Sequence, residues 1–323
     1  MGETRIERIG VIGAGTMGHG IALEFAAYGY DVALHDRDEA QLDRARVGIA
    51  EGLDRLVAIE RINGEDAAAA PPRITLGSDL TQAVGGADLV IEAVSENLAV
   101  KQALFRELDS LAPLHAIIAS NTSTFMPSLL AAATARPEQV LVAHYFNPPH
   151  LLPLVELVRG EQTSDATIAA LRDLYRGIGK APAVVAKEAP GFVGNRIQAA
   201  IFRESLAIVA AGIATIEDVD TIVKNGFGRR LAVAGPFEIA DAAGLDIKLA
   251  VCEQLFPDIA SETEIPELLR ARVARGDLGQ KTGKGYYAWT PESAAALRQR
   301  ISDGLAAIAQ LTARERNGGQ TTV

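Results

Sequence analysis

Short apolar runs, each long enough for one strand, dominate the first half of the chain. The first covers residues 6–12 and is rich in β-branched side chains, which is typical of a buried strand. Comparable runs predict strands at residues 31–34, 74–76, 89–94, 116–119, 140–144 and 183–187, with helical spacing at 98–111, 126–135 and 164–177. Strands that alternate with helices predict a parallel sheet with right-handed crossovers.

The second half of the chain has a helical pattern. It predicts helices at residues 191–211, 216–225, 236–243, 247–256 and 265–275, and a last helix that starts at Thr290-Pro291. The segment 191–211 is apolar on more than one face, which predicts burial between partners or subunits. The change of pattern predicts two domains, at residues 1–188 and 189–323.

A glycine-rich turn, Gly13-Ala14-Gly15-Thr16-Met17-Gly18, joins the first strand to a helix. In a dinucleotide-binding turn, Gly13 permits the tight bend, Gly15 lets the backbone approach a pyrophosphate, and Gly18 lets the helix pack close to the strand. Asp36 lies 18 residues beyond Gly18, where a carboxylate can accept from both ribose hydroxyls and repel a 2′-phosphate. The pattern predicts NAD rather than NADP, a preference that Arg37 would soften. The alternative is a glycine-rich turn that binds no ligand. It would leave the position of Asp36 at the end of the second strand unexplained.

Composition and charge narrow the function classes. The chain has 323 residues, enough for two domains, and its net charge of −10 argues against nucleic acid, because basic patches drive that binding. The chain has no apolar stretch of about 18 residues, which argues against a membrane span, and its polar start leaves no room for a signal peptide. We therefore expect a cytoplasmic protein with a small-molecule substrate. Cys252 is the single cysteine, and no metal-ligand spacing occurs.

Polar side chains that can do chemistry follow the ends of predicted strands. His144 ends one strand, and Glu96 and Ser123 follow two others. Because ligands bind at the carboxyl ends of parallel strands, we expect these residues to converge on one crevice. Glu156, twelve residues beyond His144, can orient the imidazole as a base. Simpler roles remain open: a surface histidine, an edge-strand carboxylate facing water for Glu156, and a helix cap for Ser123.

Six groups of residues occur in one order along the chain. They are the glycine-rich turn, Ser120-Asn121-Thr122-Ser123, His144-Tyr145-Phe146-Asn147-Pro148, Pro190-Gly191-Phe192 with Asn195-Arg196, Gly235-Pro236-Phe237-Glu238 with Gly244-Leu245-Asp246, and Lys281-Thr282-Gly283-Lys284-Gly285-Tyr286-Tyr287. Together they resemble the L-3-hydroxyacyl-CoA dehydrogenase family over roughly residues 5–289. The resemblance implies an α/β fold, with an N-terminal Rossmann doubly wound sheet followed by an all-α C-terminal domain. It also implies NAD as cofactor and a homodimer.

The resemblance implies a role for each matching residue. His144 matches the base that removes the 3-hydroxyl proton while hydride leaves C3, and Glu156 matches the acid that hydrogen-bonds it. Ser123 and Asn195 match positions that contact the substrate oxygen, and Ser123 also matches a contact to the nicotinamide region. The other positions that match NAD contacts are Asp36, Glu96, Lys101 and Lys281. Simpler roles stay open for Asn195 as a cap or mid-helix residue, Lys101 on a solvated helix face and Lys281 in an ordinary turn.

Two departures from the family concern the substrate. The serine and lysine of CoA-handling members fall, by ungapped count, on Gly52 and Ile59, although Arg55 or Arg61 offers a substitute. The segment 226–236 is longer than in CoA-type members and resembles the loop of L-gulonate and L-carnitine dehydrogenases. Arg230 in that segment can grip a carboxylate bidentately. Residues 240–246, in contrast, are typical of the CoA branch.

Three functions therefore stand as hypotheses. The first is NAD-dependent oxidation of an L-3-hydroxyacyl-CoA, such as 3-hydroxybutyryl-CoA, to the 3-keto product. The second is the same chemistry on a free 3-hydroxy acid, with the carboxylate held by Arg230. The third is a non-catalytic, crystallin-like structural protein, against which the intact set of Ser123, His144, Glu156 and Asn195 argues.

Overall fold

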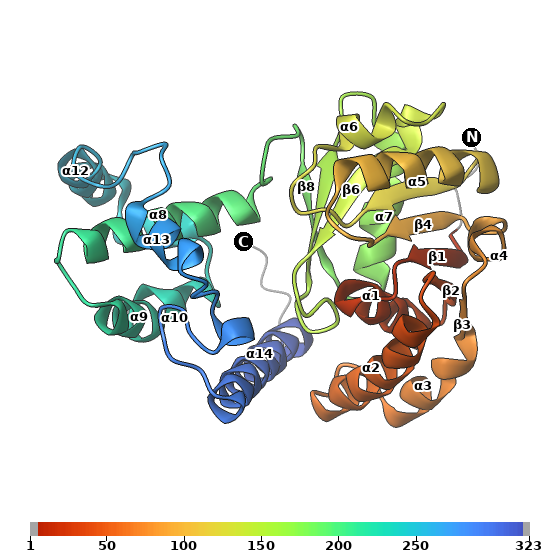
Figure 1. The fold of residues 1–323 in the computed structure, drawn as a ribbon, viewed down its shortest axis with the longest axis horizontal. Helices are drawn as coiled ribbons and strands as arrows, with labels where there is room; N and C mark the ends of the chain where they lie inside the picture. The colour runs from red at the N-terminus through yellow and green to blue at the C-terminus, as the bar shows by residue number, and fades with distance from the viewer. Residues whose placement is uncertain (1–5, 319–323) are drawn as a thin grey trace. The chain divides into compact units, whose positions relative to one another are not determined.

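Eight strands form one sheet in the structure, a computed structural model that describes residues 6–318 (Figure 1). The strands are β1 (Arg8–Ile12), β2 (Asp31–His35), β3 (Ile74–Gly77), β4 (Leu89–Glu92), β5 (Ile117–Ser120), β6 (Val140–Tyr145), β7 (Leu154–Arg159) and β8 (Ala181–Val185). Their order across the sheet is β3-β2-β1-β4-β5-β6-β7-β8. Neighbouring strands are parallel except β6 and β7, which are antiparallel. The strand order runs outward from β1 in both directions, so the predicted doubly wound α/β fold is confirmed.

Helices cover both faces of this sheet. One face packs against α1 (Thr16–Ala27), α2 (Glu39–Ala58) and α7 (Asp165–Gly177), and the other against α4 (Leu80–Val84), α5 (Leu98–Leu111) and α6 (Pro127–Ala131). Successive residues of β4 alternate between these layers: Leu89 and Ile91 belong to the first core cluster and Val90 to the second. A strand buried on both faces needs apolar side chains at every position, which explains the continuous apolar runs.

Side-chain caps fix where several of these helices begin. Asp38, Asn97 and Ser164 precede α2, α5 and α7, and each accepts a hydrogen bond from a backbone N–H in the first turn. The short helix α3 (Gly64–Ala69) follows α2, and one-turn 3₁₀ helices at Pro71–Arg73 and Pro137–Gln139 precede β3 and β6.

The direction of β7 differs from the pattern of simple alternation. The apolar run around Glu156 forms a strand, and it pairs antiparallel with β6. Only residues 146–153 separate the two strands, whereas a parallel crossover needs about a dozen residues or more. The chain therefore turns back on itself directly after His144.

Contacts divide the chain into two compact units. The first comprises the chain up to Asn195 together with the segment from Leu305, and the second comprises Arg196–Gly304. The helices after β8 are α8 (Gly194–Ala210), α9 (Ile216–Asn225), α10 (Phe227–Leu231), α11 (Pro236–Ala243), α12 (Leu245–Leu255), α13 (Glu267–Ala274) and α14 (Pro291–Gly318), with a 3₁₀ turn at Gln280–Thr282. Segment 226–236, interpreted from the sequence as a loop, contains the short helix α10. The predicted domain boundary at residues 188/189 stays a prediction.

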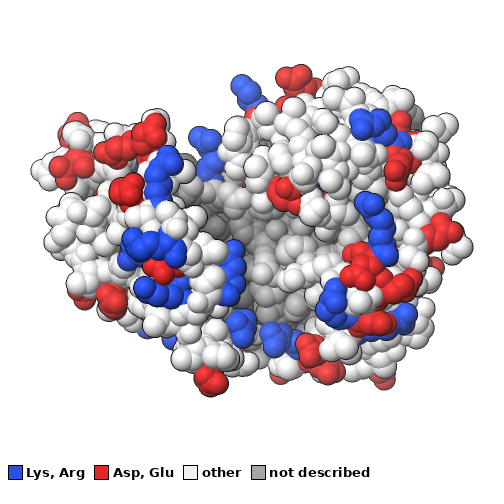
Figure 2. All heavy atoms as spheres, in the orientation of Figure 1, with Lys and Arg blue, Asp and Glu red and all other residues white. Residues whose placement is uncertain are grey.

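Charged side chains of both signs occur on the face of the molecule that Figure 2 shows. They are interspersed over both units. Within the described part of the chain, no helix is both long enough and apolar enough to span a membrane.

Candidate active site

The glycine-rich turn between β1 and α1 has the geometry of a nucleotide cradle. Gly13 has a φ of +103°, and a Cβ there would lie 2.6 Å from the carbonyl oxygen of Ala93. A Cβ on Gly18 would lie 1.7 Å from the carbonyl oxygen of Gly13, so α1 packs against the turn only because this residue is glycine. A Cβ on Gly15 would meet nothing within 4 Å. The space above Gly15 and the N–H groups at the start of α1 therefore fit a pyrophosphate.

Asp36 lies beside this turn, directly after β2. Its carboxylate accepts hydrogen bonds from the N–H of Ala14 at 2.9 Å and from that of Asp38 at 3.1 Å. It also lines a cavity of about 570 Å³ together with Gly13 and Gly15. The carboxylate predicted to bind the ribose is thus held at the same cavity as the predicted phosphate turn.

A buried ion-pair network continues this edge of the sheet at the end of β4. The ammonium of Lys101, 1% exposed, lies 2.6 Å from the carboxylate of Glu92 and 3.2 Å from that of Glu96. Glu92 also accepts a hydrogen bond from the Ser120 hydroxyl at 2.5 Å, and Glu96 accepts one from the Thr122 hydroxyl. The interpretation of Lys101 as part of a solvated helix face is therefore wrong, because it is buried between two carboxylates.

The charge of Glu96 follows from these contacts. Burial by itself raises the pKa of Glu96, but the hydrogen bond from Thr122 and the charge of Lys101 outweigh it, and the pKa lies below its ordinary value. Glu96 is therefore ionised at neutral pH, and its carboxylate can accept hydrogen bonds from a sugar hydroxyl.

His144 and Glu156 form a cross-strand pair at the antiparallel junction of β6 and β7. They are direct register partners, and Nδ1 of His144 lies 2.8 Å from Oε2 of Glu156. Both side chains are buried. Because an ionised carboxylate only accepts, Nδ1 carries the hydrogen and Nε2 is left as the basic nitrogen. Glu156 is buried in the sheet, so the alternative of an edge carboxylate facing water is wrong.

Glu156 is itself held by the turn before α8. Its second oxygen, Oε1, accepts from the backbone N–H groups of Val193 at 3.1 Å and Gly194 at 2.9 Å. Phe192, with a φ of +52°, turns the backbone so that these two N–H groups point the same way. Burial alone raises the pKa of Glu156, but the hydrogen bonds from His144, Gly194 and Val193 outweigh it and lower the pKa. The carboxylate stays ionised beside the imidazole.

Three of the four predicted catalytic residues, Ser123, His144 and Asn195, meet around one cavity. The side-chain amide of Asn195, in the first turn of α8, donates to the carbonyl of Ser123 at 3.2 Å. Ser123 does not cap a helix, since α6 begins at Pro127 with Met126 as its N-cap. The cavity of about 370 Å³ is lined by Met17, Ala93, Val94, Glu96, Lys101, Asn121, Ser123, His144, Tyr145, Phe146, Asn147 and Asn195. Glu156 lies behind His144 rather than in the cavity wall.

Three residues of this site had no predicted role of their own, although Asn121 and Phe146 stand in the motifs that resemble the family. Glu92 anchors Lys101, and its signal in the sequence is a single charge at the end of an otherwise apolar strand. Asn121 accepts from the backbone N–H of Tyr145 at 3.0 Å and so ties the end of β5 to that of β6. Phe146 places its ring 4.8 Å from that of His144, on a segment without regular structure that no periodicity predicts.

Two predicted site residues lie in the second unit. Arg230 is on α10 and Lys281 is in the 3₁₀ turn Gln280–Thr282, and both side chains are exposed. Their roles toward substrate and NAD stay predictions. Among the residues described, no group of three or more His, Cys, Asp or Glu is arranged to hold a metal ion.

The positions that match the CoA contacts of the family do not face solvent. Gly52 and Ile59 are buried, and a Cβ on Gly52 would lie 2.5 Å from a methyl group of Leu23 on α1. Arg61, one of the two suggested substitutes, is paired with the buried Glu24 at 3.0 Å. Neither Gly52 nor Ile59 can therefore offer a polar group to a ligand.

Family comparison gives matches over most of the chain. The model "3-hydroxyacyl-CoA dehydrogenase, NAD binding domain" matches residues 8–189, and "3-hydroxyacyl-CoA dehydrogenase, C-terminal domain" matches residues 191–289. A probable 3-hydroxybutyryl-CoA dehydrogenase of Deinococcus radiodurans is 38% identical over 281 residues, which are 87% of this chain and 99% of the relative.

A second group of similar proteins extends over α14 as well. The 5-formyl-3-hydroxy-2-methylpyridine 4-carboxylate 5-dehydrogenase of Mesorhizobium japonicum is 37% identical over 310 residues, 95% of this chain and 98% of the relative. A crystal structure of a dehydrogenase for this compound, described as an NAD⁺-dependent dismutase, is 36% identical with a TM-score of 0.91, and the match covers 98% of this chain and all of that one.

Proposed function

The chain belongs to the 3-hydroxyacyl-CoA dehydrogenase family, with NAD as its cofactor, and from this premise we propose that it oxidises a hydroxyl-bearing carbon of a free carboxylic acid. The observation that carries the chemistry is the pairing of His144 with Glu156 at the wall of a cavity that Ser123 and Asn195 also line. The hydride-transfer chemistry and the choice of a free acid as substrate rest on different residues.

His144 is the base of the proposed reaction. NAD, when bound, supplies the hydride acceptor in its nicotinamide ring. Nε2 of His144 takes the hydroxyl proton as the carbon gives up its hydride, so that the alcohol loses two electrons and two hydrogens and becomes a carbonyl. The imidazolium that forms lies 2.8 Å from Glu156, whose charge stabilises it and fixes the ring orientation.

Ser123 and Asn195 hold the reacting oxygen in this proposal. Asn195 and Ser123 both line the cavity that His144 lines. Donors at this point stabilise negative charge as it develops on oxygen during proton removal. Glu96, Lys101 and Asp36 hold the cofactor beside them, Glu96 and Asp36 through ribose hydroxyls.

The free-acid branch is supported by the end of α2 and by two similar proteins. Gly52 and Ile59 are buried and Arg61 is paired with Glu24, which leaves the exposed Arg55 as the one of these positions that offers CoA a polar group at the surface. Two similar proteins that match 95% or more of the chain carry in their names a pyridine carboxylate with a formyl group, and a structure named as a 3-hydroxyacyl-CoA dehydrogenase of Archaeoglobus fulgidus also covers 97% of the chain. An aldehyde reacts in the same site as its hydrate, R–CH(OH)₂, which loses one hydride and one proton to give the carboxylic acid. Oxidation of a 3-hydroxyacyl-CoA stays the second candidate, supported by relatives such as that of Deinococcus radiodurans.

A substrate panel tests the proposal. NAD reduction is followed with 3-hydroxybutyryl-CoA, free 3-hydroxybutyrate, L-gulonate, L-carnitine and 5-formyl-3-hydroxy-2-methylpyridine 4-carboxylate. The proposal expects turnover of at least one free acid, with a kcat/KM above that for the thioester. Turnover of the thioester alone would establish the second candidate instead. Failure of every compound together with intact NAD binding would favour a non-catalytic role.

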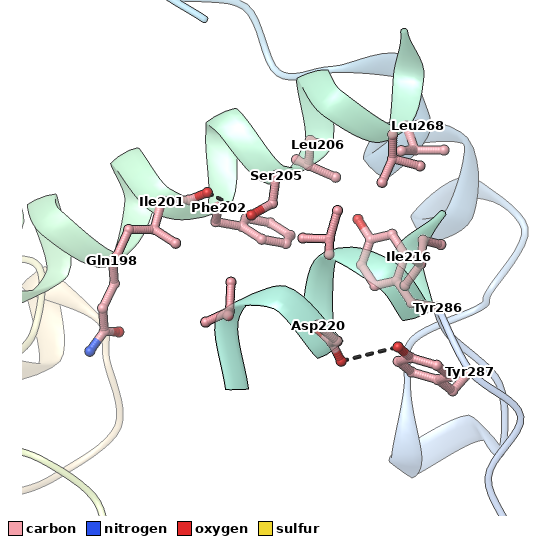
Figure 3. Close-up of a pocket in the computed structure, with 13 residues that line it drawn as sticks. Gln198, Ile201, Phe202, Ser205, Leu206, Ile216, Asp220, Leu268, Tyr286 and Tyr287 are labelled. Atoms are coloured by element: carbon pink, nitrogen blue, oxygen red, sulfur yellow. Dashed lines mark hydrogen bonds between the residues drawn. The ribbon is translucent and has the colours of Figure 1, made fainter. Parts of the chain in front are cut away.

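We also propose a homodimer formed through the second unit. In the described residues of Arg196–Gly304, the buried apolar side chains are Leu206 and Ala294, too few for a core. Helices α8 and α9 instead line an apolar cavity of about 300 Å³, where the ring of Phe202 faces that of Tyr286 and Ile201 also contributes to the wall (Figure 3). Coverage by a second copy would give this unit the core that a single copy lacks.

A further inference from the structure

Three charged side chains are buried together on the α1 face of the sheet. Glu24 on α1 and Lys180, in the turn before β8, are both fully enclosed, and Arg61, after α2, is 14% exposed at its side chain. Glu24 pairs with Lys180 at 2.8 Å through one oxygen and with Arg61 at 3.0 Å through the other. None of the three lines the cavity at His144. The proposed reaction as described so far makes no use of them.

Both cations of this cluster also fasten the segment that follows His144. The ammonium of Lys180 donates to the carbonyl oxygens of Pro149 and Leu152, the latter at 2.9 Å. The guanidinium of Arg61 donates to the carbonyl of His150 at 3.3 Å. Lys180 therefore joins two carbonyl oxygens of this segment by hydrogen bonds while its charge is paired with Glu24.

The fastened segment, residues 146–153, is the connection between β6 and β7. It lies tightly on α1, since a Cβ on Gly20 would be 2.5 Å from Cγ of Pro149. At its start, Phe146 packs its ring 4.8 Å from that of His144 and closely against Gly194, where a Cβ would be 2.5 Å from Cζ of Phe146. Asn147 lines the cavity next to it. The placement of the segment thus determines what lies against the imidazole.

We propose that Glu24, Lys180 and Arg61 are positioning residues, which hold residues 146–153 so that Phe146 keeps the His144 ring in its reactive orientation. The inference rests on the proposed function, because it concerns the base of that reaction. Buried charges are costly, and apolar side chains of similar size often stabilise a protein as well or better. A segment with two prolines at its centre and no ladder partners leaves carbonyls that only nearby donors can satisfy, and apolar substitutes have none. The charges therefore fix a geometry that hydrophobic packing would not.

A matched set of variants separates positioning from stability. Lys180→Met and Arg61→Met remove the donors to the segment. Arg136→Met removes a comparably buried arginine that pairs with Asp109 at 2.9 Å and donates to carbonyls near the end of α5, away from residues 146–153. If the single variants do not fold, the double variant Glu24→Met/Lys180→Met removes both fully buried charges and leaves Arg61, 14% exposed at its side chain, with its hydrogen bond to the His150 carbonyl.

The first readout needs no substrate. The full-length protein is labelled with ¹³C in its five histidine rings, and the His144 signal is assigned by its loss in His144→Gln. The Cε1–H shift of His144 senses the Phe146 ring current, so the proposal expects it to move or split in the Lys180 and Arg61 variants and to stay in place in Arg136→Met. An unmoved His144 signal in both Lys180→Met and Arg61→Met, or in the double variant, would overturn the proposal, whatever the panel shows.

The second readout is kinetic and uses the panel compound that the wild type oxidises fastest. Misplacement of a reacting group by about 1 Å can cost up to about 100-fold, so we expect kcat to fall about tenfold or more in the Lys180 and Arg61 variants. The KM for NAD should stay unchanged, because the cluster does not touch the glycine-rich turn. Arg136→Met should lower the melting temperature and leave kcat unchanged. If kcat fell equally in Arg136→Met, the loss of activity would be explained by general destabilisation of the protein. That result would contradict the proposal.

Discussion

His144 and Glu156 face each other across the antiparallel pair of β6 and β7, with Nδ1 of the imidazole 2.8 Å from a carboxylate oxygen. This relationship depends on the direction of the chain after β6. A parallel continuation would carry Glu156 away from His144, whereas the reversal over residues 146–153 places the two in register. The second oxygen of Glu156 is bound by two N–H groups at the start of α8, so the same carboxylate joins the sheet to that helix.

Replacement of His144 by alanine should abolish turnover without loss of the cofactor. General base catalysis contributes about 10²- to 10⁴-fold, and kcat should fall by that amount or more. The predicted phosphate and ribose contacts, in the glycine-rich turn and at Asp36, are left intact, so NAD binding, measured by calorimetry, should match the wild type. Turnover at the wild-type rate in His144→Ala would contradict the proposed mechanism.

Replacement of Glu156 by glutamine should make the stability of the protein fall less steeply as the pH decreases. Burial raises the pKa of Glu156, but hydrogen bonds from His144 and two backbone N–H groups lower it below the ordinary 4.5. The folded state therefore binds this proton more weakly than the unfolded chain. The resulting stability is fully present above about pH 4.5 and is lost as the pH falls through the lower pKa of the folded state.

Melting temperatures between about pH 3 and pH 6 would test this point. The wild type should lose stability toward acid more steeply than Glu156→Gln, although the glutamine variant starts from a lower melting temperature. Part of the slope should remain in the variant, because the pKa of Asp88 and that of Glu96 are also lowered. Identical slopes for the two proteins would show that Glu156 does not contribute.

Two glycine variants should separate cofactor binding from folding. Gly15→Ala adds a methyl group where nothing lies within 4 Å, so the protein should fold normally. That methyl group occupies the space assigned to the pyrophosphate and should weaken NAD binding about tenfold or more, equivalent to about 1.4 kcal/mol. Gly18→Ala forces a Cβ to 1.7 Å from the carbonyl of Gly13 and should cost about 1–3 kcal/mol of folding stability. Unchanged NAD affinity in Gly15→Ala would place the phosphates elsewhere.

Much of this site could be predicted from the sequence, because its elements are local. The strand, the glycine turn and Asp36 follow from periodicity and from the steric needs of glycine, and His144 stands at a strand end. The burial of charged side chains by the tertiary structure could not be predicted in the same way. Lys101 has the spacing of an exposed helix residue, and only the fold shows that Glu92 and Glu96 enclose it. The ion pair of Glu24 with Lys180 joins residues 156 positions apart, a separation that no local pattern records.

A charge placed on α8 should dissociate the proposed homodimer. Phe202 is 44% exposed and lines the apolar cavity of the second unit. Phe202→Asp would bury an unpaired carboxylate in the interface, which is strongly unfavourable. Light scattering should give the mass of two chains for the wild type and of one for the variant. Leu114→Asp, at a residue 85% exposed in the first unit, is the control that should remain a dimer. A wild-type protein that is already monomeric would contradict the proposal.

Replacement of Arg230 by alanine should distinguish a free acid from a thioester. A charge-assisted hydrogen bond to a carboxylate is worth about 1.5–3 kcal/mol, so loss of the guanidinium should raise the KM for a free acid about 10- to 100-fold. Arg229→Ala is the matched control on the same helix, because Arg229 already donates to the carbonyl of Lys224 and the side chain of Asn225. It should leave that KM unchanged. If Arg230→Ala oxidises the free acids as the wild type does, Arg230 does not hold the carboxylate, and the case for a free acid would rest on the end of α2 and on the two similar pyridine-carboxylate dehydrogenases alone.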